Sequence, residues 1–440
     1  MTSRCIVILL DGLGDRSSPV LGHKTPLQAA RTPNLDALAA LGANGLFHAE
    51  RPGVSLPSEN AHFAMFGYRQ EEFPGRGLLE ALGAGIEINP DEVYVLAHFI
   101  NAEEAGNTLY VKQHRPRVAA GEARALVQAV RRYETDDIRF VFRQTKDLDG
   151  ILALSGRVSP LITDTDPIQV DCPMMSAAPW RSAAGEREAV RTAGALNSYL
   201  SWCYRTLGDQ AGNRDRRRRN RVPVNAVVTQ RAGRWKDVES FARRWGLRGL
   251  SISSGLVFWG LAAFIGLETC KVRDSDEPGA DLAGRLDQAF SLAGDYEFIH
   301  VHTKAPDVAA HSKDPRRKVE VIEALDRGLA AAVDRAGDEE TVLIVTSDHS
   351  TPSNGPLIHS GEPVPIMVTG PGMRRDQVRR FDEINCAAGA LGQVYGGDFM
   401  PMVLNFLDRS KLKGLMDTAV DQPYWPGRRS PFRLNNENGK

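Results

Sequence analysis

The stretch that most constrains the fold of this chain is residues 341–360, TVLIVTSDHSTPSNGPLIHS. Its apolar, β-branched start (residues 342–345) has the pattern of a parallel strand buried on both faces. The run ends in Asp348 and His349, and a polar loop then leads to His359. A metal ligand is held best at the carboxyl end of such a strand, where the backbone is rigid. The segment predicts a metal site; the alternative is a capping aspartate beside a solvated histidine.

Two further segments repeat this arrangement. Residues 4–10, RCIVILL, predict a buried strand that ends at Asp11, and glycines follow it. Residues 296–301 predict another strand, followed closely by Asp307 and His311. Their spacing of four places both side chains on one face of a helix that starts near Pro306. We therefore expect an α/β sheet whose strands deliver two sets of hard ligands to one edge.

Ser58 is the candidate nucleophile. It follows a proline and opens a predicted helix, where backbone N–H groups and the helix dipole favour an anion. The alternative is a plain helix cap. Two metal ions a few ångströms apart could polarise a phosphoryl group and lower the pKa of this hydroxyl, and Lys304 could neutralise a phosphate oxygen. Residues 75–85, which include Arg76, are interpreted as a flexible, phosphate-contacting stretch.

Composition excludes several classes of protein. The 440 residues suffice for two domains or for one domain with an insertion. A net charge of -1 gives no pull towards nucleic acid or membrane. The five cysteines are odd in number and form no CxxC pair, which indicates a reducing cytoplasm. The uncharged residues 249–267 are interpreted as a buried strand, a turn and a helix, not as a membrane span. A homo-oligomer stays open.

The character of the chain changes between residues 89 and 235. Strand-like runs alternate there with helix-like ones, of which residues 121–133 and 187–207 are the longest. We interpret this region as an inserted α+β domain, with residues 1–88 and 236–440 forming the first domain. The basic run at residues 213–221, NRDRRRRNR, is interpreted as a solvated helix face, with a funnel for an anionic substrate as the second interpretation.

Several motifs, taken in order, resemble one known family. They are LLDGLGDR, KTPLQAARTPNLDALAALGANG, SENAHFAMFGY, GRGLLEALGAGIEI, TDTDP, KAPDVAAH, DHSTPS and HSGEPVPIMVTG. They cover nearly the whole chain and resemble the cofactor-independent phosphoglycerate mutases, specifically the shorter archaeal-type branch, within the alkaline phosphatase superfamily. The resemblance implies an alkaline-phosphatase-like core, with a mostly parallel sheet flanked by helices, and an inserted domain that closes over the substrate.

The resemblance also implies roles for individual residues. Ser58 would become phosphoserine, so no 2,3-bisphosphoglycerate would be needed, and the substrate would be a small phosphorylated acid such as 2- or 3-phosphoglycerate. Lys304 and Arg76 would lie in the pocket. Two divalent ions, usually manganese, zinc or magnesium in the family, would be bound by two sets of residues. The sets are Asp11, Ser58, Asp348 and His349 for one ion, and Asp307, His311 and His359 for the other.

The chain departs from the family where substrate arginines are expected. Residues 112–117, KQHRPR, stand in place of a DRRAGR-like run, and Ala97-His98-Phe99 stands in place of Arg-Cys-Asn. Asp149 replaces a further arginine, and Glu59-Asn60 follows the serine where the family usually has Asp-Thr. Arginine forks bind carboxylates and phosphates bidentately, which other residues do not reproduce. His98, His114, Arg115 and Arg117 are the candidates to compensate.

Three functions remain open on this basis. The first is a phosphoglycerate mutase-type phosphotransferase. The second is a metal-dependent phosphatase or mutase of the same superfamily that acts on another phosphoester or phosphonate, favoured by the altered arginines because a mutase must protect its intermediate from water. The third is a non-catalytic metal-binding paralogue, which the intact set of ligand types disfavours.

Overall fold

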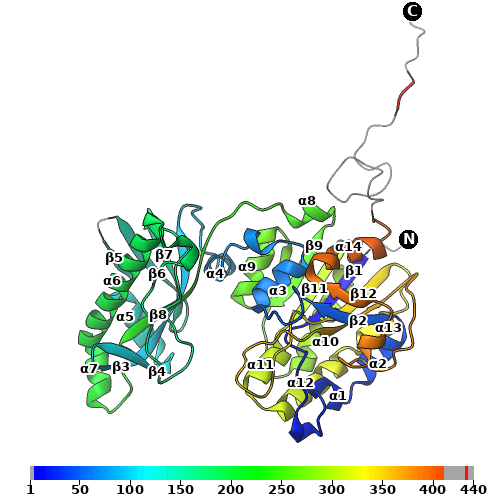
Figure 1. The fold of residues 1–440 in the computed structure, drawn as a ribbon, viewed down its shortest axis with the longest axis horizontal. Helices are drawn as coiled ribbons and strands as arrows, with labels where there is room; N and C mark the ends of the chain where they lie inside the picture. The colour runs from blue at the N-terminus through cyan, green and yellow to red at the C-terminus, as the bar shows by residue number, and fades with distance from the viewer. Residues whose placement is uncertain (1–3, 136, 411–431, 435–440) are drawn as a thin grey trace, which may run out of the picture. The chain divides into compact units, whose positions relative to one another are not determined.

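The structure is a computed structural model that describes residues 4–135, 137–410 and 432–434. The chain forms two compact units (Figure 1). The first comprises residues 1–73, 238–255 and 262–440, and the second comprises residues 74–237 and 256–261. Residues 74–88, which we expected with the first domain, group with the second unit. The functions assigned to the two domains remain predictions.

An eight-stranded sheet forms the centre of the first unit, in the order β10-β9-β11-β1-β12-β13-β2-β14. Only β13 runs against its neighbours, so the sheet is mostly parallel, as predicted. Its strands are β1 (Arg4–Leu10), β2 (Ala43–His48), β9 (Gly249–Ser254), β10 (Glu268–Val272), β11 (Phe298–Thr303), β12 (Thr341–Thr346), β13 (Val364–Thr369) and β14 (Gly392–Tyr395).

Helices flank this sheet, and their apolar faces supply the core. Side chains of α2, α10 and α12 pack on the strand residues Ile6, Ile8, Val301 and Val345. The helices of the unit are α1 (Pro26–Ala29), α2 (Pro33–Ala40), α3 (Ser58–Met65), α8 (Phe241–Trp245), α10 (Pro278–Leu292), α11 (Ala305–His311), α12 (Pro315–Gly328), α13 (Ala330–Arg335) and α14 (Gly396–Phe406).

The second unit is built on a six-stranded antiparallel sheet, in the order β4-β3-β7-β6-β5 with β8 paired to β3. Its strands are β3 (Val93–Ala105), β4 (Thr108–His114), β5 (Arg132–Glu134), β6 (Ile138–Lys146), β7 (Asp149–Gly156) and β8 (Ala226–Arg234). Its helices are α4 (Arg76–Gly83), α5 (Ala120–Ala129), α6 (Arg187–Asp209) and α7 (Ala211–Arg218).

The structure bears on three local predictions. Residues 75–85 were expected to be flexible, but Arg76 begins the helix α4. The predicted helix over residues 121–133 ends at Ala129, and β5 follows it. Residues 249–267 do form a strand and a helix, β9 and α9 (Leu256–Ile265), joined at Gly255 with φ +92°. Among the described residues, no helix combines the length and apolarity that crossing a bilayer requires.

Candidate metal centre

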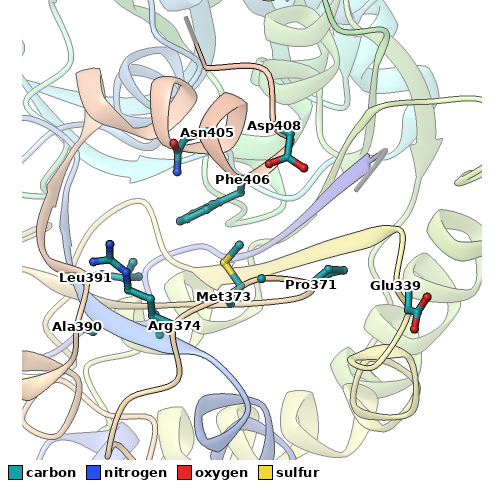
Figure 2. A pocket seen from close by; sticks show the side chains of 11 residues that line it. Glu339, Pro371, Met373, Arg374, Ala390, Leu391, Asn405, Phe406 and Asp408 are labelled. Carbon is teal, nitrogen blue, oxygen red and sulfur yellow. The ribbon is translucent and has the colours of Figure 1, made fainter. Parts of the chain in front are cut away.

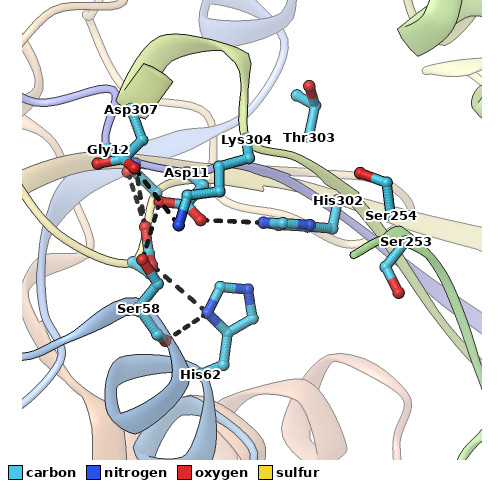
Figure 3. Close-up of polar contacts among 12 residues, drawn as sticks. Asp11, Gly12, Ser58, His62, Ser253, Ser254, His302, Thr303, Lys304 and Asp307 are labelled. Carbon is cyan, nitrogen blue, oxygen red and sulfur yellow. Dashed lines mark hydrogen bonds and ion pairs between the residues drawn. The ribbon is translucent and has the colours of Figure 1, made fainter. Parts of the chain in front are cut away.

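The predicted ligands gather at the carboxyl edge of the first unit's sheet. Strands β11, β1 and β12 are neighbours and run parallel, so their carboxyl ends meet at one edge. Asp11 directly follows β1, Asp307 lies on α11 just after β11, and Asp348 follows β12. All three carboxylates are buried. Figure 3 shows Asp11 and Asp307 beside Ser58 and Lys304.

A glycine allows two of these segments to approach closely. The backbone N–H of Asp307 donates to the carbonyl of Asp11 at 3.0 Å. Between them Gly12 adopts φ +68°, where a Cβ atom would lie 2.7 Å from Cβ of Asp307 and from Oγ1 of Thr351. Its N–H donates to Oδ1 of Asp348 at 3.1 Å. The LLDGLG motif therefore needs glycine both for its left-handed backbone and for space.

Ser58 lies within reach of this edge. It is the first residue of α3 and is buried, and Pro57 occupies the cap position, so the serine is not a plain helix cap. Its Oγ lies 2.9 Å from Nε2 of His349 and 3.4 Å from Oδ1 of Asp11. The hydroxyl thus stands at a helix N-terminus with its oxygen directed at the ligand cluster.

The protonation of His349 follows from its neighbours. Thr351 Oγ1 donates to Oδ1 of Asp307 at 2.8 Å, so it can only accept from Nδ1 of His349, 3.1 Å away. Nε2 therefore carries the lone pair of the ring, beside Oδ2 of Asp348 at 3.2 Å and Oδ1 of Asp11 at 3.3 Å. Burial lowers the pKa of His349 to about 4, so the ring is neutral at pH 7. A neutral imidazole nitrogen among carboxylates is a typical transition-metal ligand.

A second group of donors surrounds Asp307. Nε2 of His311 and Nε2 of His359 lie 3.3 Å and 3.5 Å from its Oδ1. Nδ1 of His359 donates to the carbonyl of Leu56 at 2.9 Å, which leaves Nε2 as the ligand atom. The His359 ring stacks on His349 with centroids 3.8 Å apart, so the two groups adjoin.

The buried carboxylates of this cluster carry negative charge that bound cations would neutralise. Burial and the nearby Asp348 raise the pKa of Asp11 well above its usual value. Burial alone would do the same to Asp307, but its side-chain interactions with His311 and His359 hold the pKa of Asp307 below normal. Oδ2 of Asp307 and Oδ2 of Asp348 are buried and accept no hydrogen bond from the described residues. Such oxygens beside imidazole nitrogens fit divalent metal ions.

Lys304 and Arg76 are the other predicted pocket residues. Nζ of Lys304 lies 3.4 Å from Oδ2 of Asp307, beside the ligand cluster. Arg76 belongs to the second unit, where its Nε donates to Glu80 at 2.7 Å. Its predicted contact with substrate remains a prediction.

The four residues predicted to compensate for the replaced arginines also lie in the second unit. His98 and His114 contact each other, with Nε2 and Nδ1 3.0 Å apart. Arg115 pairs with Asp149 at 2.7 Å, so that carboxylate is neutralised in place, and Arg117 is exposed. In the basic run, Arg216 is buried against Glu122 while most of its neighbours are exposed, which makes the run chiefly a solvated helix face.

Sequence reasoning assigned no role to three buried histidines beside the cluster. Nε2 of His302 contacts Oδ2 of Asp11 at 3.1 Å, and Nδ1 of His62 donates to the carbonyl of Ser58 at 2.8 Å (Figure 3). The His300 ring packs edge-on against His62, with centroids 5.4 Å apart. The signal was the spacing: His62 lies one helical turn after Ser58, and His300 and His302 share one face of β11.

A separate cavity of about 650 Å³ opens at the opposite, amino edge of the parallel strands (Figure 2). It is lined by Glu339, just before β12, and by Arg374, Phe406 and Asp408. None of the predicted ligands lines it. The chemistry of the first unit is therefore assigned to the carboxyl edge.

Comparison with known proteins gives consistent matches over most of the chain. Residues 3–406 match the model of the Metalloenzyme superfamily. A 2,3-bisphosphoglycerate-independent phosphoglycerate mutase 2 of Methanocaldococcus jannaschii is 41% identical over 421 residues, which cover 94% of this chain and 95% of that protein.

Two solved structures share the fold. The PH0037 protein from Pyrococcus horikoshii superposes with a TM-score of 0.76 and 26% identity, covering 94% of this chain and all of that one. A cofactor-independent phosphoglycerate mutase from Thermoplasma acidophilum gives a TM-score of 0.62 and 28% identity, with coverage of 92% and 100%.

Proposed function

The chain belongs to the 2,3-bisphosphoglycerate-independent phosphoglycerate mutases of the Metalloenzyme superfamily, and from that membership we propose that it interconverts 2- and 3-phosphoglycerate through a phosphoserine on Ser58. The observation that carries the proposal is the position of the Ser58 hydroxyl. It lies 2.9 Å from His349 and 3.4 Å from Asp11, inside the cluster of metal-type donors. Capping a helix does not require a serine hydroxyl to contact a histidine and an aspartate of a metal-type cluster.

Two divalent ions, manganese, zinc or magnesium, complete the site in this proposal. Asp11, Ser58, Asp348 and His349 hold one ion, and Asp307, His311 and His359 hold the other. The oxygens of Asp307 and Asp348 that accept no hydrogen bond from the described residues support these sets. The three histidine ligands favour a transition-metal ion such as zinc over magnesium. When bound, such ions polarise a phosphoryl group and lower the pKa of a coordinated serine hydroxyl.

The residues of the chain have distinct tasks. The Ser58 oxygen bonds to phosphorus and loses its proton, while the bond from phosphorus to the substrate oxygen breaks and that oxygen gains a proton. The phosphoryl group then returns from Ser58 to the neighbouring hydroxyl of the same glycerate, which loses its proton as Ser58 regains one. The N-terminal end of α3, where the helix dipole is positive, stabilises the transferred anion. Lys304 neutralises a phosphate oxygen beside Asp307. Because Ser58 itself carries the group, no bisphosphate cofactor is required.

A second candidate, a metal-dependent phosphatase or a mutase for another phosphoester or phosphonate, is favoured by one observation. Arg115, an arginine near the expected substrate clamp, is paired with Asp149 at 2.7 Å. An arginine that is already paired binds a substrate carboxylate less well. A weaker clamp admits water, and water would then take the phosphoryl group from Ser58.

One coupled assay separates these functions. The purified chain, loaded with manganese, is incubated with 3-phosphoglycerate while 2-phosphoglycerate and free phosphate are followed together. We expect the isomer to form without phosphate release. Phosphate alone would show a hydrolase on the same centre. If neither 2-phosphoglycerate nor phosphate forms, that result would contradict phosphoglycerate as the substrate.

A further inference from the structure

Three metal-type donors also converge in the second unit, on three separate segments. His98 lies on β3, His114 is the last residue of β4, and Asp166 lies in the loop after β7. Nε2 of His98 is 3.0 Å from Nδ1 of His114 and 3.5 Å from Oδ2 of Asp166. The third edge of the triangle, from His114 Nδ1 to Asp166 Oδ2, measures 3.9 Å.

The size of this triangle fits a small divalent ion. Ligand atoms bound to zinc at about 2.0–2.2 Å and tetrahedral angles lie about 3.4 Å from one another. The three observed separations bracket that value. Without an ion, the hydrogen bond between the two rings uses a single proton. Asp166 Oδ2 lies too far from either ring nitrogen to share it, so a single ring proton lies among two nitrogens and a carboxylate oxygen.

The carboxylate of Asp166 is held in place by its surroundings. The backbone N–H of Ile168 donates to Oδ1 at 2.7 Å, and Nε2 of Gln230 donates to Oδ2 at 2.8 Å. Ile168 has φ +68°, a strained conformation for a β-branched residue. The loop is tied to β8 by Thr165, whose N–H donates to the carbonyl of Thr229 at 2.8 Å. Such outer contacts are typical of groups that orient a metal ligand.

We propose that His98, His114 and Asp166 bind a divalent transition-metal ion of the zinc type, separate from the ions of the first unit. Two imidazoles and one carboxylate leave a fourth position for water or an anion. His98 and Asp166 are almost fully buried, whereas 18% of the His114 side chain is exposed, so the site reaches solvent at that ring. The proposal does not depend on the mutase activity.

The site would also explain why the substrate-binding arginines of the family are replaced in this chain. This step does rest on the proposed function. A cation with an open position binds a carboxylate or a phosphate, which is the task of an arginine fork. The substrate anion would then be its fourth ligand.

The test is the metal content of the full-length chain after loading with zinc and dialysis, measured by elemental analysis. We expect His114→Ala and Asp166→Asn each to lose one zinc ion per chain relative to wild type. Asp171→Asn is the matched control, because Asp171 is an exposed aspartate of the same unit. It should retain the wild-type content. When the proteins are loaded with cobalt instead, the spectra of His114→Ala and Asp166→Asn should lack the visible absorption of one tetrahedral cobalt site that wild type shows.

Equal zinc content in wild type, His114→Ala and Asp166→Asn would overturn the proposal. Asp166→Asn could disturb its loop, so circular dichroism and the thermal midpoint are measured for every variant. The partly exposed His114 decides the matter if Asp166→Asn is unfolded. Metal content is measured without turnover. A wild-type chain that binds the zinc ion of this site but has no mutase activity would therefore contradict only the mutase proposal.

Discussion

At the scale of single residues, the proposed nucleophile is one hydroxyl with defined neighbours. Ser58 combines burial, a helix N-terminus and contact with His349 and Asp11. His349 can face it with a lone pair only because Thr351 fixes the tautomer of the ring. A threonine two residues after the histidine is therefore part of the site, although it is neither a nucleophile nor a metal ligand in the proposal.

Replacing Ser58 by alanine should abolish turnover while the metal content stays close to wild type. The variant loses the nucleophile but retains the carboxylates and imidazoles, and loss of a nucleophile typically lowers kcat by at least about a thousand-fold. The check is the coupled assay together with elemental analysis. Ser17→Ala, at an exposed serine of the same unit, is the control. Turnover that survives in Ser58→Ala would rule out the phosphoserine.

Gly12 is a second position where one atom decides the outcome. In Gly12→Ala the new Cβ would press on Asp307 and Thr351, so we expect a lower thermal midpoint and weaker zinc binding. Overpacking of this kind costs about 1–3 kcal/mol. Gly22→Ala is a matched control, since Gly22 has φ +65° with no atom within 4 Å of its Cβ position. Equal effects in both variants would mean that backbone strain alone is responsible.

At the scale of elements, a buried lysine stabilises the carboxyl edge of the first unit's sheet. Nζ of Lys318, on α12, donates to the carbonyls of Gly14 and Thr351 at 2.8 Å and 2.9 Å and pairs with Asp15 at 3.1 Å. It thereby joins the loop after β1 to the loop after β12. Glu383 lies beside this group and accepts from Thr25 Oγ1 at 2.8 Å and from the N–H of Asp15 at 3.2 Å.

This group predicts a pH dependence of stability. Burial raises the pKa of Glu383 to about 7, whereas an unfolded glutamate titrates near about 4.3. Between about pH 4.3 and pH 7 the Glu383 carboxyl is therefore protonated in the folded state but ionised in the unfolded state. The stability that this proton contributes is fully present below about pH 4.3 and is lost as pH rises through 7. We expect the thermal midpoint of Glu383→Gln to rise relative to wild type between pH 5 and pH 8. A constant difference, as expected for the exposed Glu50→Gln control, would contradict the shifted pKa.

At the scale of the whole molecule, the two units divide the work in our proposal. Every predicted metal ligand of the phosphoryl site belongs to the first unit, whereas Arg76 and the candidate substrate residues His98, His114, Arg115 and Arg117 belong to the second. Metal binding at the phosphoryl site should therefore tolerate changes in the second unit that alter substrate affinity.

The pair formed by Arg115 and Asp149 tests this division. If Arg115 binds a substrate anion, Arg115→Ala should raise KM for 3-phosphoglycerate, and Asp149→Asn should lower it by freeing the guanidinium. Both side chains are partly exposed, so the change should be about two- to five-fold. Glu134→Gln is the control, because it breaks an Arg–Glu pair of equal length in the same unit. Changes of KM in one direction for both variants would contradict the role of Arg115.

The sequence by itself determined the local features of this protein. Apolar β-branched runs predicted β1 and β12, and the acids that follow them placed Asp11 and Asp348 near strand ends. Pro57 and Ser58 predicted the start of α3. These predictions held because strand burial and helix starts depend on neighbouring residues. Boundaries that depend on distant packing, such as the end of α5 at Ala129, were misplaced.

Only the tertiary structure decided which of these groups meet. The order β11-β1-β12 brings strand ends that are hundreds of residues apart in sequence to one edge, and Gly12 lets Asp307 close against it. In the second unit, His98, His114 and Asp166 meet because β3 pairs with both β4 and β8. The local pattern of a sequence carries no record of strand order or of the contacts that order creates, so a cluster built across strands is visible only in the folded chain.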